Sequence, residues 1–139
     1  MNPCFFTLTL TLFLHTVVDE KLYSRQLYVM GHEAQRRMMA SKALVVGCSG
    51  LGVEVAKNCI LAGLHSLVLV DPLPATTFEL GGNFYLTETG GQRASTCREE
   101  LAQLNPYVNV SVASDVTELT AEQLLPLLDT GVSCLVVTI

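Results

Sequence analysis

The stretch Lys42–Asp71, KALVVGCSGLGVEVAKNCILAGLHSLVLVD, determines the fold expected for the rest of the chain. It contains the apolar run ALVV at 43–46, the turn GCSGLG at 47–52, a segment with helical patterning, and the run SLVLV before Asp71. A buried strand, a glycine turn, a crossover helix and a second strand ending in a carboxylate form a βαβ mononucleotide-binding unit. The stretch therefore predicts an α/β fold.

The glycines and the carboxylate of this unit are candidate nucleotide-binding residues. Gly47, Gly50 and Gly52 let the backbone approach a phosphate, which the free N–H groups of the following helix would bind. Asp71 is placed to accept a hydrogen bond from a ribose hydroxyl, although a structural role at the strand end is an alternative. Because Ser49 replaces the middle glycine of G-x-G-x-x-G, we expect a degenerate site.

Composition limits the possible classes. The 139 residues are 50% hydrophobic, which suits one domain with a real core. A net charge of −5 gives no electrostatic reason to expect a nucleic-acid or membrane partner. The five cysteines are scattered and odd in number, so neither a disulfide framework nor a metal site is predicted. A reducing compartment fits this pattern.

The first 18 residues have no acidic or basic side chain. We predict that 1–18 form an apolar leader outside the fold, and that 19–139 form one partial domain. Two alternatives stay open. The run Phe5 to Leu14 has the length of a signal-peptide core, but no Lys or Arg precedes it and no cleavage site follows. The Thr-Leu alternation at 7–12 has the period of an added edge strand.

The rest of the chain alternates between helical and strand patterns. A helical pattern opens at Asp19 and Glu20, and Gly31 is expected to break it. After Asp71, a connection rich in Pro, Thr and Gly leads to a predicted helix at 93–104, strand at 108–113, helix at 120–128 and strand at 133–137. This order predicts a mostly parallel sheet with helices on both faces. Because a core strand stands last, we expect a truncated domain, incomplete at the C-terminus.

Four motifs together resemble the start of a eukaryotic ubiquitin-activating or ubiquitin-like-modifier-activating enzyme, in the ThiF/MoeB-like superfamily. They are YSRQ at 23–26, GLGVE at 50–54, NFYL at 83–86 and LNPY at 104–107, in the family's order and spacing. The resemblance covers about Asp19 to the end and implies a Rossmann-like domain. Such enzymes use ATP and Mg²⁺ to convert the C-terminal carboxylate of ubiquitin or a ubiquitin-like protein into an acyl adenylate. They combine an active and an inactive half.

The resemblance implies that this chain belongs to the inactive half. Active halves carry glycine at the position of Ser49, aspartate at Leu73, a phosphate-binding arginine at Gly82 and lysine at Arg93. Losing a guanidinium that stabilises pyrophosphate is commonly worth several kcal/mol in the transition state. We therefore expect no adenylation and no cofactor for this chain alone. ATP and Mg²⁺ would be bound by the active half of the assembled enzyme.

Arg25 acquires a second interpretation from the resemblance. Its spacing alone indicates a solvated helix face. In the family, however, the arginine of Tyr-x-Arg-Gln reaches across to the terminal phosphates of the ATP in the other half, and a planar fork suits that role. The resemblance thus implies a catalytic role for Arg25 in trans. It also implies an active half and ubiquitin or a ubiquitin-like protein as partners, and a cytoplasmic and nuclear location.

Two other functions stay open. The βαβ unit with Asp71 also permits an NAD(P)-binding oxidoreductase, although Ser49 argues against it. A noncatalytic truncated isoform could instead act as an interaction module that occupies the surface of an active partner. Cys48 lies in the turn near a helix N-terminus, which can lower a thiol pKa, but a small residue that fills the turn is the simpler interpretation.

Overall fold

The computed structural model describes residues 17–138, which form two compact units divided between Ala40 and Ser41. The predicted leader at 1–18 falls almost wholly on 1–16, which lie outside the described residues, so that prediction and the domain division stay untested. No helix within 17–138 is long and apolar enough to cross a bilayer.

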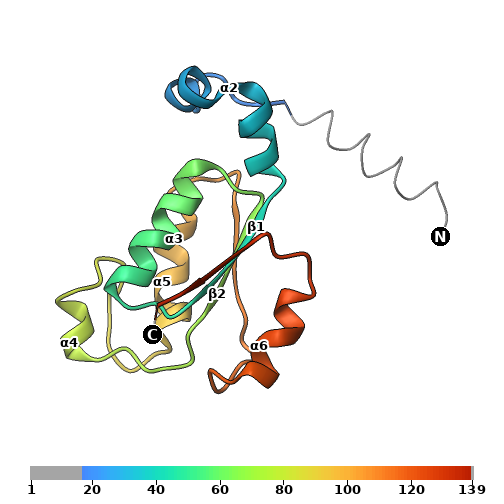
Figure 1. The fold of residues 1–139 in the computed structure, drawn as a ribbon. Helices are drawn as coiled ribbons and strands as arrows, with labels where there is room; N and C mark the ends of the chain where they lie inside the picture. The colour runs from blue at the N-terminus through green and yellow to red at the C-terminus, as the bar shows by residue number, and fades with distance from the viewer. Residues whose placement is uncertain (1–16, 139) are drawn as a thin grey trace, which may run out of the picture. The chain divides into compact units, whose positions relative to one another are not determined.

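The first unit is helical. Asp19 opens it with a carboxylate that accepts hydrogen bonds from the Lys21 and Leu22 N–H groups, at 3.0 and 3.1 Å. The regular helix α2 then runs over Ser24–Met39, later than the pattern from Asp19 predicts. Gly31, with φ of 80° and ψ of 169°, bends α2 into two segments, as expected from its freedom to adopt positive φ (Figure 1).

The second unit is a four-stranded parallel sheet in the order β3-β2-β1-β4, which confirms the predicted Rossmann-like α/β fold (Figure 1). Its elements are β1 Lys42–Val46, α3 Gly50–Ala62, β2 Ser66–Val70, α4 Thr77–Leu80, α5 Arg93–Ala102, β3 Asn109–Val112, α6 Ala121–Leu128 and β4 Cys134–Val137. Val46 pairs with Val70, so the glycine turn and Asp71 follow at the same edge of the sheet.

Alternate residues of the central strand face opposite sides, as a period of two requires. On one face, Ala43 and Val45 of β1 pack in a core with buried apolar side chains of α3 and α5. On the other face, Leu44 and Val46 pack in a core that includes Leu124, Leu127 and Leu128 of α6. Figure 1 shows α3 and α5 on the side of the sheet away from α6. The predicted helices on both faces are therefore confirmed.

One element departs from the prediction. The connection at 72–82 contains the short helix α4, which the sequence pattern treats as loop. A capping box stabilises the start of α4. The Thr76 side chain caps the first turn, and the Glu79 carboxylate accepts a hydrogen bond from the Thr76 N–H at 2.9 Å.

Candidate functional site

The glycine turn is shaped by close backbone approaches. Gly47 has a φ of 93°, and a Cβ there would lie 2.1 Å from the carbonyl oxygen of Thr138. A Cβ on Gly52 would lie 1.9 Å from the carbonyl oxygen of Gly47. The Thr138 hydroxyl donates a hydrogen bond to that same oxygen at 2.9 Å. These glycines thus permit the close strand–helix packing typical of a dinucleotide fingerprint.

A second loop covers the start of α3. A Cβ on Gly50 would lie 2.5 Å from the carbonyl oxygen of Gly82, so that oxygen lies against the first residue of the helix. A helix N-terminus attracts anions, and a carbonyl oxygen carries partial negative charge. The loop therefore places a backbone carbonyl of the chain itself close to the start of α3. Ser49 precedes α3 in an extended backbone conformation, and its side chain makes no capping hydrogen bond.

The carboxylate of Asp71 is buried and already bonded within the chain. One of its oxygens accepts the Cys48 N–H at 2.7 Å, and the other accepts the Leu73 N–H at 3.0 Å. Arg93 adds a cation, with Nη1 3.6 Å from Asp71 Oδ2. Only 1% of the Asp71 side chain is exposed. Each oxygen thus accepts a backbone hydrogen bond and the side chain is buried, which favours the structural role of Asp71 over ribose binding.

Arg93 connects Asp71 to α4. Its guanidinium, in a side chain 16% exposed, also forms an ion pair with Glu79. The Glu79 carboxylate accepts hydrogen bonds from the hydroxyl and N–H of Thr76, and the hydroxyl contributes most to holding the pKa of Glu79 below its ordinary value. We call Asp71, Arg93 and Glu79 the Arg93 network. Sequence reasoning missed it, although the T-x-x-E spacing of a capping box at 76–79 could have indicated Glu79.

Asn83 ties the loop around Gly82 to the glycine turn. Its buried amide donates to the Cys48 carbonyl oxygen at 2.9 Å, and its own oxygen accepts the Tyr85 N–H at 3.0 Å. Burial first, and then the charge of Asp71, raises the pKa of the Cys48 thiol far above its ordinary value. A thiol of this kind stays protonated and unreactive, which supports the interpretation that Cys48 fills the turn.

Arg25 belongs to the first unit and lies in the first turn of α2. Its side chain is exposed and forms no hydrogen bond or ion pair with any residue at positions 17–138. The first turn of α2 contains no acidic residue. A cation near a helix N-terminus opposes the helix dipole, so this position is not explained by helix stability.

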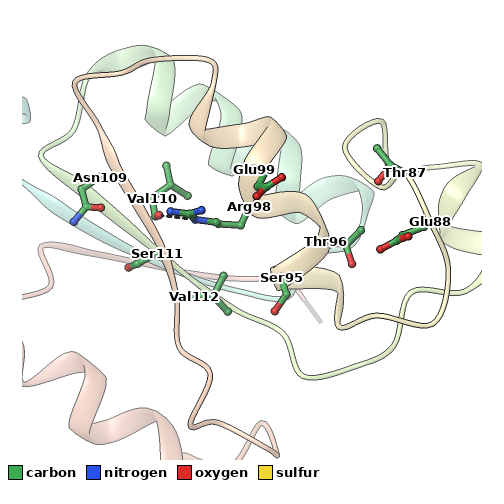
Figure 2. A pocket seen from close by; sticks show the side chains of 10 residues that line it. All are labelled: Thr87, Glu88, Ser95, Thr96, Arg98, Glu99, Asn109, Val110, Ser111 and Val112. Atoms are coloured by element: carbon green, nitrogen blue, oxygen red, sulfur yellow. Dashed lines mark hydrogen bonds between the residues drawn. The ribbon is translucent and has the colours of Figure 1, made fainter.

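A hollow of about 550 Å³ lies away from the glycine turn, between α5 and β3 (Figure 2). Its lining is mostly polar, and none of the predicted site residues contributes to it. Arg98 crosses it and donates from Nε to the Val110 carbonyl oxygen at 3.2 Å. Within the described part of the chain, no group of three or more His, Cys, Asp or Glu residues could hold a metal ion.

The sheet order, the turn after β1 and the carboxylate after β2 define a Rossmann-like domain in which that carboxylate contacts the Cys48 N–H and Arg93. Comparison with known families narrows this class. The ThiF family matches residues 23–135, and the chain belongs to this family.

Relatives of the chain carry names that agree with the resemblance. It is 49% identical over 123 residues to "Ubiquitin-activating enzyme E1 1" of Schizosaccharomyces pombe. The matched region covers 87% of this chain and 11% of that protein. It is 44% identical over 131 residues to human "Ubiquitin-like modifier-activating enzyme 7". The matched region covers 85% of this chain and 13% of that protein. The chain thus spans about a tenth of the length of these relatives.

A solved structure agrees with the fold. The crystal structure of E. coli tRNA N6-threonylcarbamoyladenosine dehydratase, TcdA, in complex with ATP superposes with a TM-score of 0.77. The match covers 89% of this chain and 52% of that one at 19% identity, which establishes the fold alone.

Proposed function

We propose that this chain is part of the inactive adenylation half of a ubiquitin-like-modifier-activating enzyme. The observation that carries the proposal is the buried Asp71 carboxylate, which a bound nucleotide would need but which already accepts two backbone hydrogen bonds and lies 3.6 Å from Arg93. The Gly82 carbonyl at the start of α3 adds to this. The same occupation of Asp71 argues against the NAD(P)-dependent alternative.

In the assembled enzyme, ATP and Mg²⁺ would be bound by an active partner half, in cis or in trans. The structural likeness to TcdA, which was crystallised with ATP, supports ATP as the nucleotide. The C-terminal carboxylate of ubiquitin or a ubiquitin-like protein would attack the α-phosphorus. The bond between the α- and β-phosphates would break, leaving an acyl adenylate and pyrophosphate.

Arg25 would act on the leaving group. Its guanidinium is exposed and unpaired within 17–138, so it is available to a partner. Two parallel N–H donors and a fixed charge would stabilise the negative charge that grows on pyrophosphate as the bond breaks. The chain would therefore contribute to catalysis without binding the nucleotide. A cytoplasmic and nuclear location is part of the same proposal.

The test is a graft into a complete enzyme. Residues 19–138 replace the matching segment of the S. pombe relative, and ATP–pyrophosphate exchange is measured. We expect Arg25→Ala to slow exchange by about 10²- to 10³-fold, the usual effect of removing one charge-stabilising donor. Arg37→Ala is the matched control, because Arg37 lies on the same helix and forms a surface ion pair with Glu33. Equal exchange rates in the two variants would contradict the proposal.

The size of the native protein tests whether the partner half is in cis. An antibody against residues 21–31 isolates the protein for intact mass spectrometry. A mass several times 15.1 kDa is expected for an activating enzyme that contains both halves. A mass near 15.1 kDa would contradict the arrangement in cis and leave only a partner supplied in trans.

A further inference from the structure

The outer edge of β3 presents backbone hydrogen-bonding groups. β3 lies at one end of the described sheet, next to β2. The N–H groups of Asn109 and Ala113 donate toward β2, at 3.2 and 3.0 Å, so alternate residues of the strand are paired on that side. The N–H and C=O groups of the residues between them, Val110 and Val112, therefore point away from β2.

Arg98 covers part of this edge with its side chain. Its Nε donates to the Val110 carbonyl oxygen at 3.2 Å, as an N–H group of a neighbouring strand would (Figure 2). The N–H of Val110 and both backbone groups of Val112 form no hydrogen bond within residues 17–138. A row of unpaired backbone groups is a template for another strand. The chain itself thus satisfies only part of the β3 edge.

The space beside this edge has room for a peptide segment. The hollow of about 550 Å³ between α5 and β3 falls within the range of about 300–1,000 Å³ that is usual for ligand clefts. We call it the β3 groove. Its lining consists of all four residues of β3, side chains of α5, and the loop residues 87–88. An extended segment of similar length would therefore lie along the whole strand.

Charge indicates which segment the β3 groove would bind. Glu88 and Glu99 both line it, and neither forms an ion pair within residues 17–138. Arg98 supplies one positive charge, so two carboxylates against one guanidinium leave the lining with a net charge of −1. A segment with lysine or arginine side chains would complement this charge.

We propose that the β3 groove binds an extended, basic segment of a partner protein as a strand added beside β3. Backbone groups of the segment pair with those of Val110 and Val112, and its basic side chains contact Glu88 and Glu99. Arg98 releases the Val110 carbonyl oxygen to an N–H group of the segment. This inference goes beyond the proposed function, because the groove contains no residue of the first unit or of the Arg93 network.

Peptide binding to the 139-residue chain tests the strand pairing. The probe is a fluorescein-labelled peptide, KVKVKV. One control, EVEVEV, reverses its charge, and a second is KVKVKV N-methylated at every residue, which keeps the charge but has no backbone donor. Fluorescence anisotropy should show at least about tenfold tighter binding of the probe than of either control, since several strand hydrogen bonds or both charge contacts are lost. Equal binding of the N-methylated peptide would overturn the inference.

Hydrogen exchange measured by NMR tests the location. At a concentration of KVKVKV that saturates binding, exchange of the Val110 and Val112 amides should slow by at least about tenfold, because they acquire hydrogen-bond partners. The amides of β4, at the opposite end of the described sheet, serve as the control and should keep their rates. Protection of β4 instead of β3, or of neither strand, would overturn the inference.

Paired substitutions test the charge contacts. Glu88→Gln with Glu99→Gln should weaken binding of KVKVKV by about fivefold, as expected for two exposed ion pairs. Glu100→Gln with Glu122→Gln makes the same change in net charge outside the groove and should leave binding within about twofold. All four side chains are exposed, so both variants should fold like the parent. Equal weakening in the two variants would contradict the contacts with Glu88 and Glu99.

Arg98→Ala tests the exchange of partners at the edge. It frees the Val110 carbonyl oxygen before the peptide arrives and removes a charge of the same sign as the peptide. KVKVKV should therefore bind about threefold more tightly to this variant than to the parent. Unchanged or weaker binding would contradict the step in which Arg98 releases that oxygen.

Discussion

Arg93 and Arg25 are used in opposite ways. Arg93 has a side chain that is 16% exposed, and it forms ion pairs with both Asp71 and Glu79. Arg25 is exposed and has no partner among residues 17–138. A buried ion pair holds neighbouring elements in place, whereas an exposed, unpaired arginine contributes nothing evident to the fold. The comparison shows one arginine used inside the fold, beside Asp71, and one left exposed on the surface.

The largest effect should separate these two arginines in stability. Arg93→Ala leaves the buried Asp71 carboxylate without its cation and should cost about 3 kcal/mol of unfolding free energy. Arg25→Ala should change it by less than about 0.5 kcal/mol, as for an exposed residue. Urea unfolding of the 139-residue chain measures both. Similar losses of unfolding free energy in the two variants would contradict the different roles assigned to Arg93 and Arg25.

The covering loop can be tested with a pair of glycines. Gly50→Ala forces a Cβ against the Gly82 carbonyl oxygen and should cost about 2 kcal/mol. Gly82→Ala meets no atom within 4 Å and should change stability by less than about 0.5 kcal/mol. Thermal unfolding of both variants checks this. If Gly50→Ala is as stable as Gly82→Ala, the loop does not lie against α3.

Acid should weaken the Arg93 network. The folded state lowers the pKa of Glu79, chiefly through the Thr76 hydroxyl, so the ionised carboxylate contributes stability above the unfolded pKa. That contribution is lost as the pH falls from the ordinary glutamate value of about 4.3 through the lower folded value. Urea midpoints measured from pH 6 to pH 3 should fall less steeply in Glu79→Gln than in the parent. Parallel curves would show that Glu79 contributes nothing to the acid sensitivity.

The smallest effect is expected from restoring the active pattern. Ser49→Gly with Gly82→Arg returns the glycine and the arginine of active halves, and the backbone at Gly82 leaves room for a side chain. We expect the double variant still to bind ATP no tighter than about 1 mM by calorimetry, because Asp71 stays occupied. Tighter binding would show that Ser49 and the missing arginine at position 82, and not the contacts of Asp71, prevent ATP binding.

Much of this fold could be predicted because its strands and turns have strong local signals. The runs at 43–46 and 66–70 are continuous and apolar, as buried parallel strands require, and the glycine turn between them fixes the crossover. Gly31 breaks α2 for a reason visible in the residue itself. Such features depend on a few neighbouring residues.

The Arg93 network could not be predicted from these signals. Arg93 meets Asp71 and Glu79 across two connections, and its position depends on α4, whose only signal is the pair Thr76 and Glu79. The Gly82 carbonyl at the start of α3 is equally hidden, since a backbone group in a loop carries no sequence pattern. Departures at Ser49 and Gly82 indicate a degenerate site, but the contact of Arg93 with Asp71 depends on tertiary structure.

The contact between Gly47 and Thr138 has a consequence for synthesis on the ribosome. The hydroxyl that holds the glycine turn lies 91 residues downstream of it, and β1 acquires β4 as its second neighbour over a similar separation. Contacts of such high sequence separation form late and slowly. While the nascent chain is still short of β4, the apolar edge of β1 has no strand beside it. Chaperone binding during translation would protect that edge from pairing with other chains.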